Sequence, residues 1–361
     1  MVAHQFIDLA QPQPACQALA GAAQIGVDTE FMREKTYYAQ LCLVQFSVGE
    51  DLWCADPLGA EDLSAFWDAL LAPGWVLHSG RQDFEVVVQS AGRLPTQVFD
   101  TQVAAALLGH APQMGYANLV AELFNVQLEK SHTRADWSRR PLSAAELKYA
   151  AEDVAWLLPA YEELRSRLAE RDRLSWAEQD SADLLDPTLY VTAAGTAIDR
   201  VKGARNLQGR ARRAAVRLAE WRERRAEQSD KPRQWVLRDA VLLEMAVSNP
   251  RSSAALGQID GMQAGTVRRA GDELLELLRD ADAADDEPYT APARPDEAQK
   301  KLLKMLQKKV TACAQELGIA AEVLAPRREL LAAIDGAREE RVLRGWRRDV
   351  IGLELLELLE A

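Results

Sequence analysis

The sequence predicts an α/β domain with a mixed sheet in the first half of the chain and two all-α domains in the second half. In the first half, short apolar runs of β character alternate with amphipathic helical patterns. From about Ala197 the β pattern stops, and helical sequence rich in Arg, Glu, Ala and Leu remains. A segment near 280–297, rich in acidic residues, Ala and Pro, divides this helical half and is typical of a linker.

The order of elements in the first half indicates how the sheet is built. Strands that follow closely on one another, and then strands that alternate with helices, favour a mixed sheet flanked by helices. The expected strands cover 24–28, 41–47, 51–55, 75–78 and 97–100. The expected helices cover 61–71, 84–91, 101–108, 117–124, 144–157 and 158–169.

The helical half contains two stretches that resemble each other. "VLRDAVLLEMA" from Val236 parallels "VLAPRRELLAAI" from Val323, and "RRAGDELLELL" from Arg268 parallels "RRDVIGLELLELL" from Arg347. Repetition of this kind indicates two related helical domains. We therefore expect domains at 1–195, 196–283 and 296–361, with a linker at 284–295.

Composition indicates an ordinary globular protein, with 361 residues, 48% hydrophobic and 27% charged. No apolar run reaches the ~18 residues of a membrane span, and the N-terminus lacks the pattern of a secretory signal. The four cysteines are scattered, as in a protein of a reducing compartment. These features favour a cytoplasmic protein. Because no long heptad pattern is present, we expect a monomer.

Charge is divided unevenly along the chain, whose net charge is −12. Residues 1–190 carry 13 Lys and Arg against 27 Asp and Glu, whereas residues 191–361 carry 30 against 28. Within the second part, residues 199–238 hold 13 basic and 5 acidic side chains. A basic stretch favours contact with a polyanion, and an acidic domain can also approach one when divalent cations neutralise it.

Two acidic residues follow the apolar run of the first expected strand, in the sequence "VDTEF". Because side chains two residues apart on a strand face the same way, Asp28 and Glu30 project side by side. Like charges this close repel each other unless a cation lies between them. The pattern therefore predicts a cation site.

Two further acids follow in informative contexts. In "HSGRQDFEVV", Asp83 opens a helix after a strand, a position that taken alone favours stabilisation of the helix N-terminus. In "PLSAAELKYAAEDV", Tyr149 and Asp153 lie one turn apart on a mostly apolar helix face, where a carboxylate needs a partner. Asp100 is expected to be an N-cap rather than a member of this set.

Together these acids predict a site for hard divalent cations. Carboxylate oxygens with few His or Cys nearby suit Mg²⁺ or Mn²⁺ better than Zn²⁺. Two such ions ~3.5–4 Å apart would neutralise the carboxylates and bind both oxygens of an in-line phosphoryl displacement.

The motifs "VDTEF", "HSGRQDFEVV" and "YAAEDV", in this order and spacing, resemble the three exonuclease motifs of the DEDD superfamily, in its Tyr-type branch. "RADWSRRPLSAAELKYAAEDV" resembles the bacterial ribonuclease D family, and the whole chain follows that family's layout. The resemblance implies a ribonuclease H-like exonuclease domain followed by two HRDC domains. The match to the first HRDC domain, with "WVLRDAVLLEMA" and "LGQIDGM", is closer than the match to the second.

The resemblance also implies residue roles. Asp28, Glu30, Asp83 and Asp153 would bind two divalent metals, Mg²⁺ or Mn²⁺, and Tyr149 would orient the attacking water. The implied activity is 3′-to-5′ exoribonuclease hydrolysis that releases nucleoside 5′-monophosphates and trims the 3′ ends of tRNA precursors and other structured RNAs.

Six side chains near these motifs are candidates for contact with RNA. They are Phe31, Met32, His78, Trp137, Arg139 and Arg140. The first two could stack on a base or pack in the core, and His78 could contact substrate but is more often structural at a strand end. The segment 130–141 is basic with an aromatic residue interleaved, although Trp137 could instead be buried.

Two other functions remain open at this point. The same acids would serve a DNA-directed 3′–5′ exonuclease, because only contact with the ribose 2′-OH separates RNA from DNA. A catalytically inactive nucleic-acid binding protein is less favoured, since all four acids and the tyrosine are present.

Overall fold

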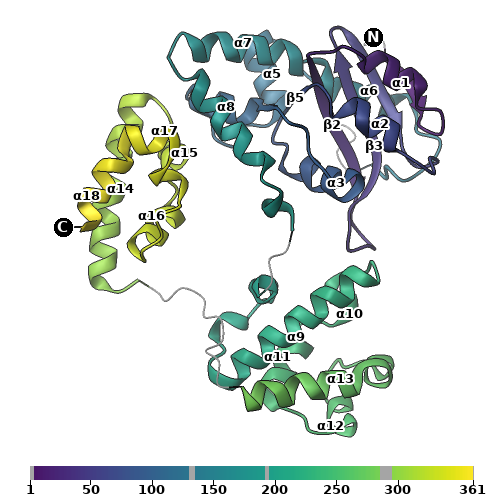
Figure 1. Ribbon diagram of the computed structural model, residues 1–361, viewed down its shortest axis with the longest axis vertical. Helices are drawn as coiled ribbons and strands as arrows, with labels where there is room; N and C mark the ends of the chain where they lie inside the picture. The colour runs from purple at the N-terminus through teal and green to yellow at the C-terminus, as the bar shows by residue number, and fades with distance from the viewer. Residues whose placement is uncertain (1–3, 130–134, 192–194, 285–294, 361) are drawn as a thin grey trace. The chain divides into compact units, whose positions relative to one another are not determined.

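The computed structural model describes residues 4–129, 135–191, 195–284 and 295–360, and these fall into two compact units. Of the described residues, the first unit contains those within 4–32, 41–189 and 295–360, and the second contains 33–40, 190–191 and 195–284. Figure 1 shows the sheet and its helices in the first unit and the α9–α13 helices in the second.

A six-stranded mixed sheet forms the centre of the first unit, as the sequence predicts, with strand order β1-β4-β3-β2-β5-β6. The pairs β1–β4, β2–β5 and β5–β6 are parallel, and β3–β4 is antiparallel. The strands are β1 (Gln5–Asp8), β2 (Gln24–Met32), β3 (Gln40–Val48), β4 (Asp51–Asp56), β5 (Gly74–Leu77) and β6 (Val98–Asp100).

The structure corrects the expected strands at two places. Strand β2 continues beyond Asp28 to Met32, so Glu30 lies within the strand and not after it. Strand β1 was not expected from the sequence. It has four residues, of which only Ile7 is buried, and an edge strand this short and exposed has little hydrophobic pattern.

The helices of the α/β domain follow the predicted order, with α1 and α8 added. They are α1 (Gln13–Leu19), α2 (Ser64–Leu70), α3 (Arg81–Ala91), α4 (Thr101–Leu107), α5 (Tyr116–Phe124), α6 (Ala144–Ala155), α7 (Leu157–Ala169) and α8 (Leu174–Ala182). Helix α6 begins at the predicted capping box of Ser143 and Glu146. Asp100 caps α4, since its side chain accepts hydrogen bonds from the backbone of Gln102 and Val103.

The C-terminal helices pack in the same unit as the sheet. They are α14 (Glu297–Leu317), α15 (Ala321–Leu324), α16 (Arg327–Ile334), α17 (Gly345–Arg347) and α18 (Leu353–Glu360). One hydrophobic cluster joins α4 and α7 to these helices. Trp176 and Trp346 stack with ring centroids 4.2 Å apart, and the Arg347 guanidinium binds both carboxylate oxygens of buried Asp180, at 2.5 and 2.7 Å. This C-terminal domain therefore shares a core with the α/β domain.

The second unit is helical, with α9 (Gly209–Gln228), α10 (Arg233–Val236), α11 (Asp239–Ser248), α12 (Ser253–Gly257) and α13 (Ala264–Ala283). Its core gathers apolar side chains from α9, α11 and α13, including Leu218, Leu242 and Leu274. The segment Arg33–Gln40 belongs to this unit, although the expected boundaries placed it in the first domain. No described helix is long and apolar enough to cross a membrane.

Candidate active site

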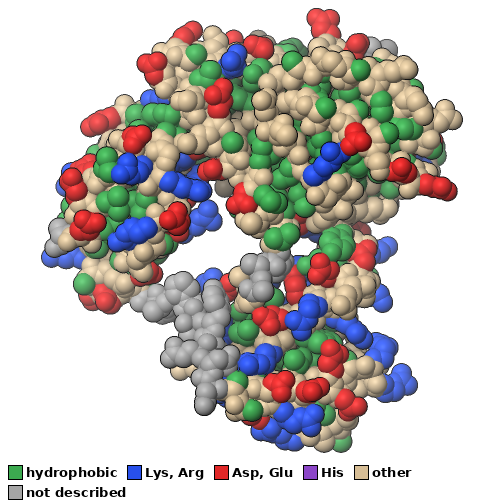
Figure 2. Space-filling model, in the orientation of Figure 1, with side chains coloured by type: hydrophobic (Ala, Val, Ile, Leu, Met, Phe, Trp, Pro, Cys, Tyr) green, Lys and Arg blue, Asp and Glu red, His purple; other side chains and the backbone are tan. Residues whose placement is uncertain are grey.

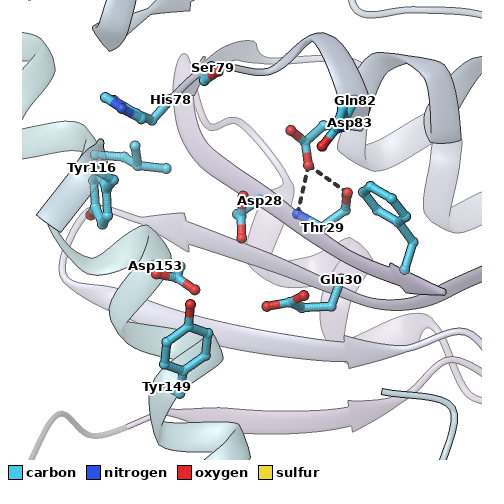
Figure 3. A pocket seen from close by; sticks show the side chains of 12 residues that line it. Asp28, Thr29, Glu30, His78, Ser79, Gln82, Asp83, Tyr116, Tyr149 and Asp153 are labelled. Atoms are coloured by element: carbon cyan, nitrogen blue, oxygen red, sulfur yellow. Dashed lines mark hydrogen bonds between the residues drawn. The ribbon is translucent and has the colours of Figure 1, made fainter. Parts of the chain in front are cut away.

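Strand β2 presents the first two acids. Asp28 and Glu30 are partly exposed, and Thr29 between them is buried, as the alternation of a strand requires. The sequence predicted that the two carboxylates share one face. The structure places both in the wall of a single cavity (Figure 3).

Helix α3 brings Asp83 to the same cavity from the other side of β2. Asp83 lies in the first turn of α3 and is 8% exposed. Its Oδ1 accepts hydrogen bonds from the Thr29 backbone N at 3.1 Å and from Thr29 Oγ1 at 2.6 Å. A second carboxylate fixes the turn before α3, because the backbone N–H groups of Ser79 and Gly80 donate hydrogen bonds to the Asp100 side chain.

Helix α6 supplies the fourth acid and the tyrosine. Tyr149 and Asp153 lie one turn apart and share a hydrogen bond between the phenol and the carboxylate. The ring of Trp137 packs beside Tyr149, with centroids 6.2 Å apart. Figure 3 shows the Tyr149 hydroxyl pointing toward Asp153, opposite the strand that carries Asp28 and Glu30.

The cavity has a volume of about 460 Å³ and contains all four predicted acids. One oxygen each from Asp28, Glu30 and Asp153 lies within 4.8 Å of the others. Asp83 lines the same cavity but is not part of this close trio. Among the described residues that line the cavity there is no Lys or Arg. The described lining of this cavity therefore provides no Lys or Arg to neutralise these carboxylates.

Crowding and burial change the protonation of the acids. Burial raises the pKa of Asp28 well above its ordinary value, and the nearby Asp83, Asp153 and Glu30 raise it further. Burial, followed by Asp153 and Asp83, raises the pKa of Glu30 to about 9. Burial raises the pKa of Asp153 to about 7 and that of Asp83 to about 6, and the Thr29 hydrogen bonds oppose the rise at Asp83.

The donor set suits a divalent cation. Hard oxygen donors within 4.8 Å of one another match the ligands that Mg²⁺ and Mn²⁺ prefer. The raised pKa values mean that burial and mutual repulsion destabilise the anionic forms of Asp28 and Glu30 in the folded chain. A bound divalent cation would offset this destabilisation. The residues present therefore fit such an ion.

Besides the acids and Tyr149, the cavity wall includes Thr29 and the two predicted contacts Phe31 and His78. His78 Nε2 lies 2.8 Å from the carbonyl oxygen of Met114 and Nδ1 lies 2.9 Å from Thr101 Oγ1, so framework atoms engage both ring nitrogens. The hydroxyl of Tyr116 accepts a hydrogen bond from the Trp156 backbone at 2.9 Å. Ser79, Gln82, Tyr116 and Leu157 complete the wall.

Sequence reasoning missed these wall residues for different reasons. Gln82 directly precedes Asp83 within the recognised motif and could have been proposed from its position. Tyr116 belongs to an ordinary amphipathic helix pattern, and only the packing of α5 beside α7 brings it to the cavity.

The predicted substrate contacts on β2 separate into two groups. Phe31 lines the cavity, whereas Met32 packs against the core cluster beneath α6.

The structure also corrects the interpretation of the segment before α6, of which residues 130–134 lie outside the described chain. Trp137 is only 2% exposed and belongs to the core, so the buried alternative holds. Arg140 binds Asp56 at 2.5 and 2.7 Å and donates to the carbonyl oxygens of Trp137 and Cys42. Arg139 pairs with Glu146 at 3.1 Å but keeps most of its side chain exposed.

Comparison with known proteins agrees with this geometry. Residues 4–169 match the family described as 3′-5′ exonuclease, and residues 212–278 match the HRDC domain. The chain is 37% identical to ribonuclease D of Xanthomonas oryzae pv. oryzae, over 95% of this chain and 94% of that protein. It is also 37% identical to ribonuclease D of Acidiphilium cryptum, over 95% of this chain and 89% of that protein.

A solved structure extends the similarity to the whole fold. The crystal structure of Escherichia coli RNase D matches with a TM-score of 0.88 and 30% identity, and it covers 99% of each chain. That protein is described as an exoribonuclease involved in structured RNA processing. The mixed-sheet domain followed by helical HRDC sequence is therefore confirmed as the fold, and the chain belongs to the ribonuclease D family of 3′–5′ exoribonucleases.

Proposed function

We propose that the chain hydrolyses the last phosphodiester bond of an RNA with the help of two divalent cations, Mg²⁺ or Mn²⁺, held by Asp28, Glu30, Asp83 and Asp153. The observation that carries this proposal is the trio of carboxylate oxygens within 4.8 Å, in a cavity that Asp83 also lines. When bound, such ions neutralise the acids and lower the pKa of a coordinated water. The products are a nucleoside 5′-monophosphate and a shortened 3′-hydroxyl end.

Tyr149 acts by orientation and not by taking a proton. Burial and the neighbouring Asp153, Glu30 and Asp28 raise the pKa of Tyr149 far above its ordinary value, so the side chain remains a phenol at neutral pH. Its hydrogen bond to Asp153 fixes the hydroxyl, whose oxygen lone pairs can still accept a hydrogen bond from the attacking water. The proton of that water must therefore go to another acceptor.

Three of the six candidate substrate contacts remain in this proposal. Phe31 and His78 line the cavity and can pack against the terminal nucleotide, and Arg139 has an exposed guanidinium for a phosphate. Met32, Trp137 and Arg140 instead belong to the framework that supports β2 and α6.

The substrate is proposed to be RNA with a free 3′ end, including tRNA precursors, acted on by a cytoplasmic monomer. Similarity to ribonuclease D along nearly the whole chain supports RNA over DNA. The domains are proposed to divide at 1–195, 196–283 and 296–361, with the linker 284–295 lying mostly outside the described residues.

The test uses 5′-labelled single-stranded RNA and DNA of the same sequence, each with Mg²⁺, Mn²⁺ or EDTA, resolved on a sequencing gel. We expect a metal-dependent ladder that shortens RNA from its 3′ end, is weak on DNA and disappears in Asp28→Asn. Equal ladders on DNA would favour the DNA-directed enzyme. Binding without cleavage under every metal condition would refute the proposed catalytic role of the acids.

A further inference from the structure

Strand β3 buries two polar side chains, Gln45 and Ser47, inside the α/β domain. They are 0% and 1% exposed, whereas Figure 2 shows the charged side chains on the outer surface of the molecule. In the described part of the chain, neither amide atom of Gln45 nor the hydroxyl of Ser47 has a hydrogen-bond partner. A buried polar group without a partner costs free energy, and such groups are rare in folded proteins.

Strand β4 shows on which face of the sheet Gln45 lies. Gln45 is paired with Cys54 in the antiparallel β3–β4 ladder, and the side chains of directly paired residues share a face. The Cys54 thiol donates a hydrogen bond to the carbonyl oxygen of Leu147 in α6, at 3.8 Å. The Gln45 side chain therefore lies between the sheet and α6, the helix that carries Tyr149 and Asp153.

Strand β2 is the other neighbour of β3, and only residues 33–39 connect the two strands. A connection this short joins antiparallel strands, since a parallel pair needs a crossover of a dozen or more residues. A Cβ atom at Gly26 of β2 would collide with the hydroxyl of Ser47, so these two residues lie opposite each other. Two residues further along β2 and two residues back along β3, Asp28 and Gln45 therefore also lie opposite each other.

The face that these residues share is the one on which the catalytic cavity lies. A Cβ atom at Gly26 would lie 3.0 Å from the Cβ of Leu157, which lines the cavity. Asp28 lines the cavity from the position opposite Gln45. Gln45 is not among the described residues of the wall, so its amide is placed to act on Asp28 and not on a substrate.

Two of the other acids are held by a hydrogen bond from a neighbouring side chain. Thr29 donates to Asp83, and the phenol of Tyr149 bonds to Asp153. Carboxylates that bind a metal are in general held by such bonds, which orient them toward the ion. For Asp28 the side chain in the corresponding position is that of Gln45. Opposite Cβ atoms of an antiparallel pair are ~4.5–5.5 Å apart, within reach of a glutamine amide.

We propose that Gln45 is a positioning residue for catalysis, whose amide donates a hydrogen bond to the Asp28 carboxylate when that carboxylate binds a divalent cation. The inference rests on the metal site of the proposed function. It gives the buried amide a partner in the state of the enzyme that performs the reaction. Ser47 has no such role, because the residue opposite it is Gly26, which offers no side chain.

The test compares the wild type with Gln45→Met, which keeps an unbranched side chain of similar length and removes the amide. Mn²⁺ binding to the full chain without RNA, measured by electron paramagnetic resonance, should weaken about 10–100-fold, the typical loss for a group that supports a metal ligand. The Mg²⁺ midpoint of RNA hydrolysis should rise by a similar factor. The Tm in EDTA should not fall, because methionine leaves no buried amide unpaired.

Ser47→Ala is the matched control, because it removes the other unpaired polar group on the same face of β3. It should leave Mn²⁺ binding and the Mg²⁺ midpoint unchanged. Gln45→Leu removes the amide with a side chain of different shape and should lose Mn²⁺ affinity as Gln45→Met does. A lower Tm without any change in Mn²⁺ binding would show that Gln45 serves packing alone and would overturn the proposal. Equal losses of Mn²⁺ affinity in Gln45→Met and Ser47→Ala would overturn it too.

Metal binding distinguishes failure of this inference from failure of the proposed function. If the wild type cleaves RNA with Mg²⁺ and Gln45→Met binds Mn²⁺ as tightly as the wild type, the catalytic proposal stands and the role of Gln45 fails. If the wild type binds Mn²⁺ but cleaves nothing, and Gln45→Met loses Mn²⁺ affinity, the positioning role stands and the catalytic proposal fails. A wild type that binds no Mn²⁺ would overturn both.

Discussion

Thr29 donates two hydrogen bonds to one carboxylate oxygen of Asp83, from its backbone N at 3.1 Å and from its hydroxyl at 2.6 Å. The residue between the two acids of β2 therefore holds the acid of α3. These bonds stabilise the anionic form, because they oppose the rise that burial causes in the pKa of Asp83. Thr29, the middle residue of the "DTE" motif, is therefore more than a spacer between two acids, because it lines the cavity and holds Asp83 in place.

We expect Thr29→Val to weaken metal-dependent activity. Valine keeps the β-branched shape and the backbone bond but removes the hydroxyl bond, so the pKa of Asp83 should rise further and its anion should be less available. Loss of such a supporting bond typically costs about 10–100-fold in metal affinity or activity. The measurement is the Mg²⁺ midpoint of RNA hydrolysis. Thr29→Ser, which retains the hydroxyl, is the control, and an unchanged midpoint in Thr29→Val would contradict the expectation.

Asp28→Asn should abolish hydrolysis and yet stabilise the metal-free protein. Removing this charge relieves the repulsion from Asp83, Asp153 and Glu30 in a buried site. A gain of about 1 kcal/mol would raise Tm by roughly 2–4 °C for a domain of 150–250 residues. Thermal unfolding in EDTA measures this change.

Metal addition provides the complementary measurement. A cation that binds only the folded state raises its stability, so Mg²⁺ should raise the Tm of the wild type and have less effect on Asp28→Asn. A lower Tm for the variant in EDTA would show that the carboxylates do not destabilise the metal-free fold.

The acids could be predicted from the sequence because their positions follow from local periodicity. The i, i+2 relation on a strand brought Asp28 and Glu30 together, and the i, i+4 relation on a helix did the same for Tyr149 and Asp153. The family resemblance, and not periodicity, predicted that the acids of β2, α3 and α6 meet at one site.

Contacts that depend on tertiary packing were not predictable in this way. The basic segment before α6 looked like a nucleic-acid contact, but Trp137 is buried and Arg140 binds Asp56 on β4. An arginine in a loop has the same local sequence whether its partner is a phosphate or a carboxylate 84 residues away. The core shared by the C-terminal helices and the α/β domain likewise depends on long-range pairs such as Asp180 and Arg347.

Tyr149→Phe should reduce kcat while leaving the Mg²⁺ midpoint nearly unchanged. The phenol remains protonated because its pKa is raised, so it orients water and does not bind a cation as phenolate. A loss of about 100-fold is the lower range for groups that assist proton transfer. The decisive measurement is the pH profile of kcat. If Tyr149 only orients the water, the variant should be slower at every pH with a profile of unchanged shape, whereas loss of one limb would identify the tyrosine as the base.

Acid should destabilise the second unit through Glu223. This carboxylate binds Arg233 at 2.5 and 2.6 Å and accepts hydrogen bonds from Arg200 and the Tyr37 hydroxyl at 2.8 Å each. Although burial acts in the opposite direction, the hydrogen bonds from Arg233 and Tyr37 and the charges of Arg233 and Arg200 lower the pKa of Glu223 to about 2. The folded value lies below the unfolded value of about 4.3, so the unfolded state binds the proton more readily.

The stabilisation from Glu223 should therefore be complete at neutral pH and decline as pH falls from about 5 to about 2. Glu223→Gln should lower stability at pH 7, because it removes the charge that Arg200 and Arg233 share, and should flatten the decline. Urea unfolding of the wild type and of Glu223→Gln, followed by tryptophan fluorescence at several pH values, measures both effects. Glu276→Gln, at an exposed position on α13, is the matched control and should follow the wild type. If Glu223→Gln lost the same stability at pH 3 as at pH 7, the carboxylate charge would not be the stabilising element.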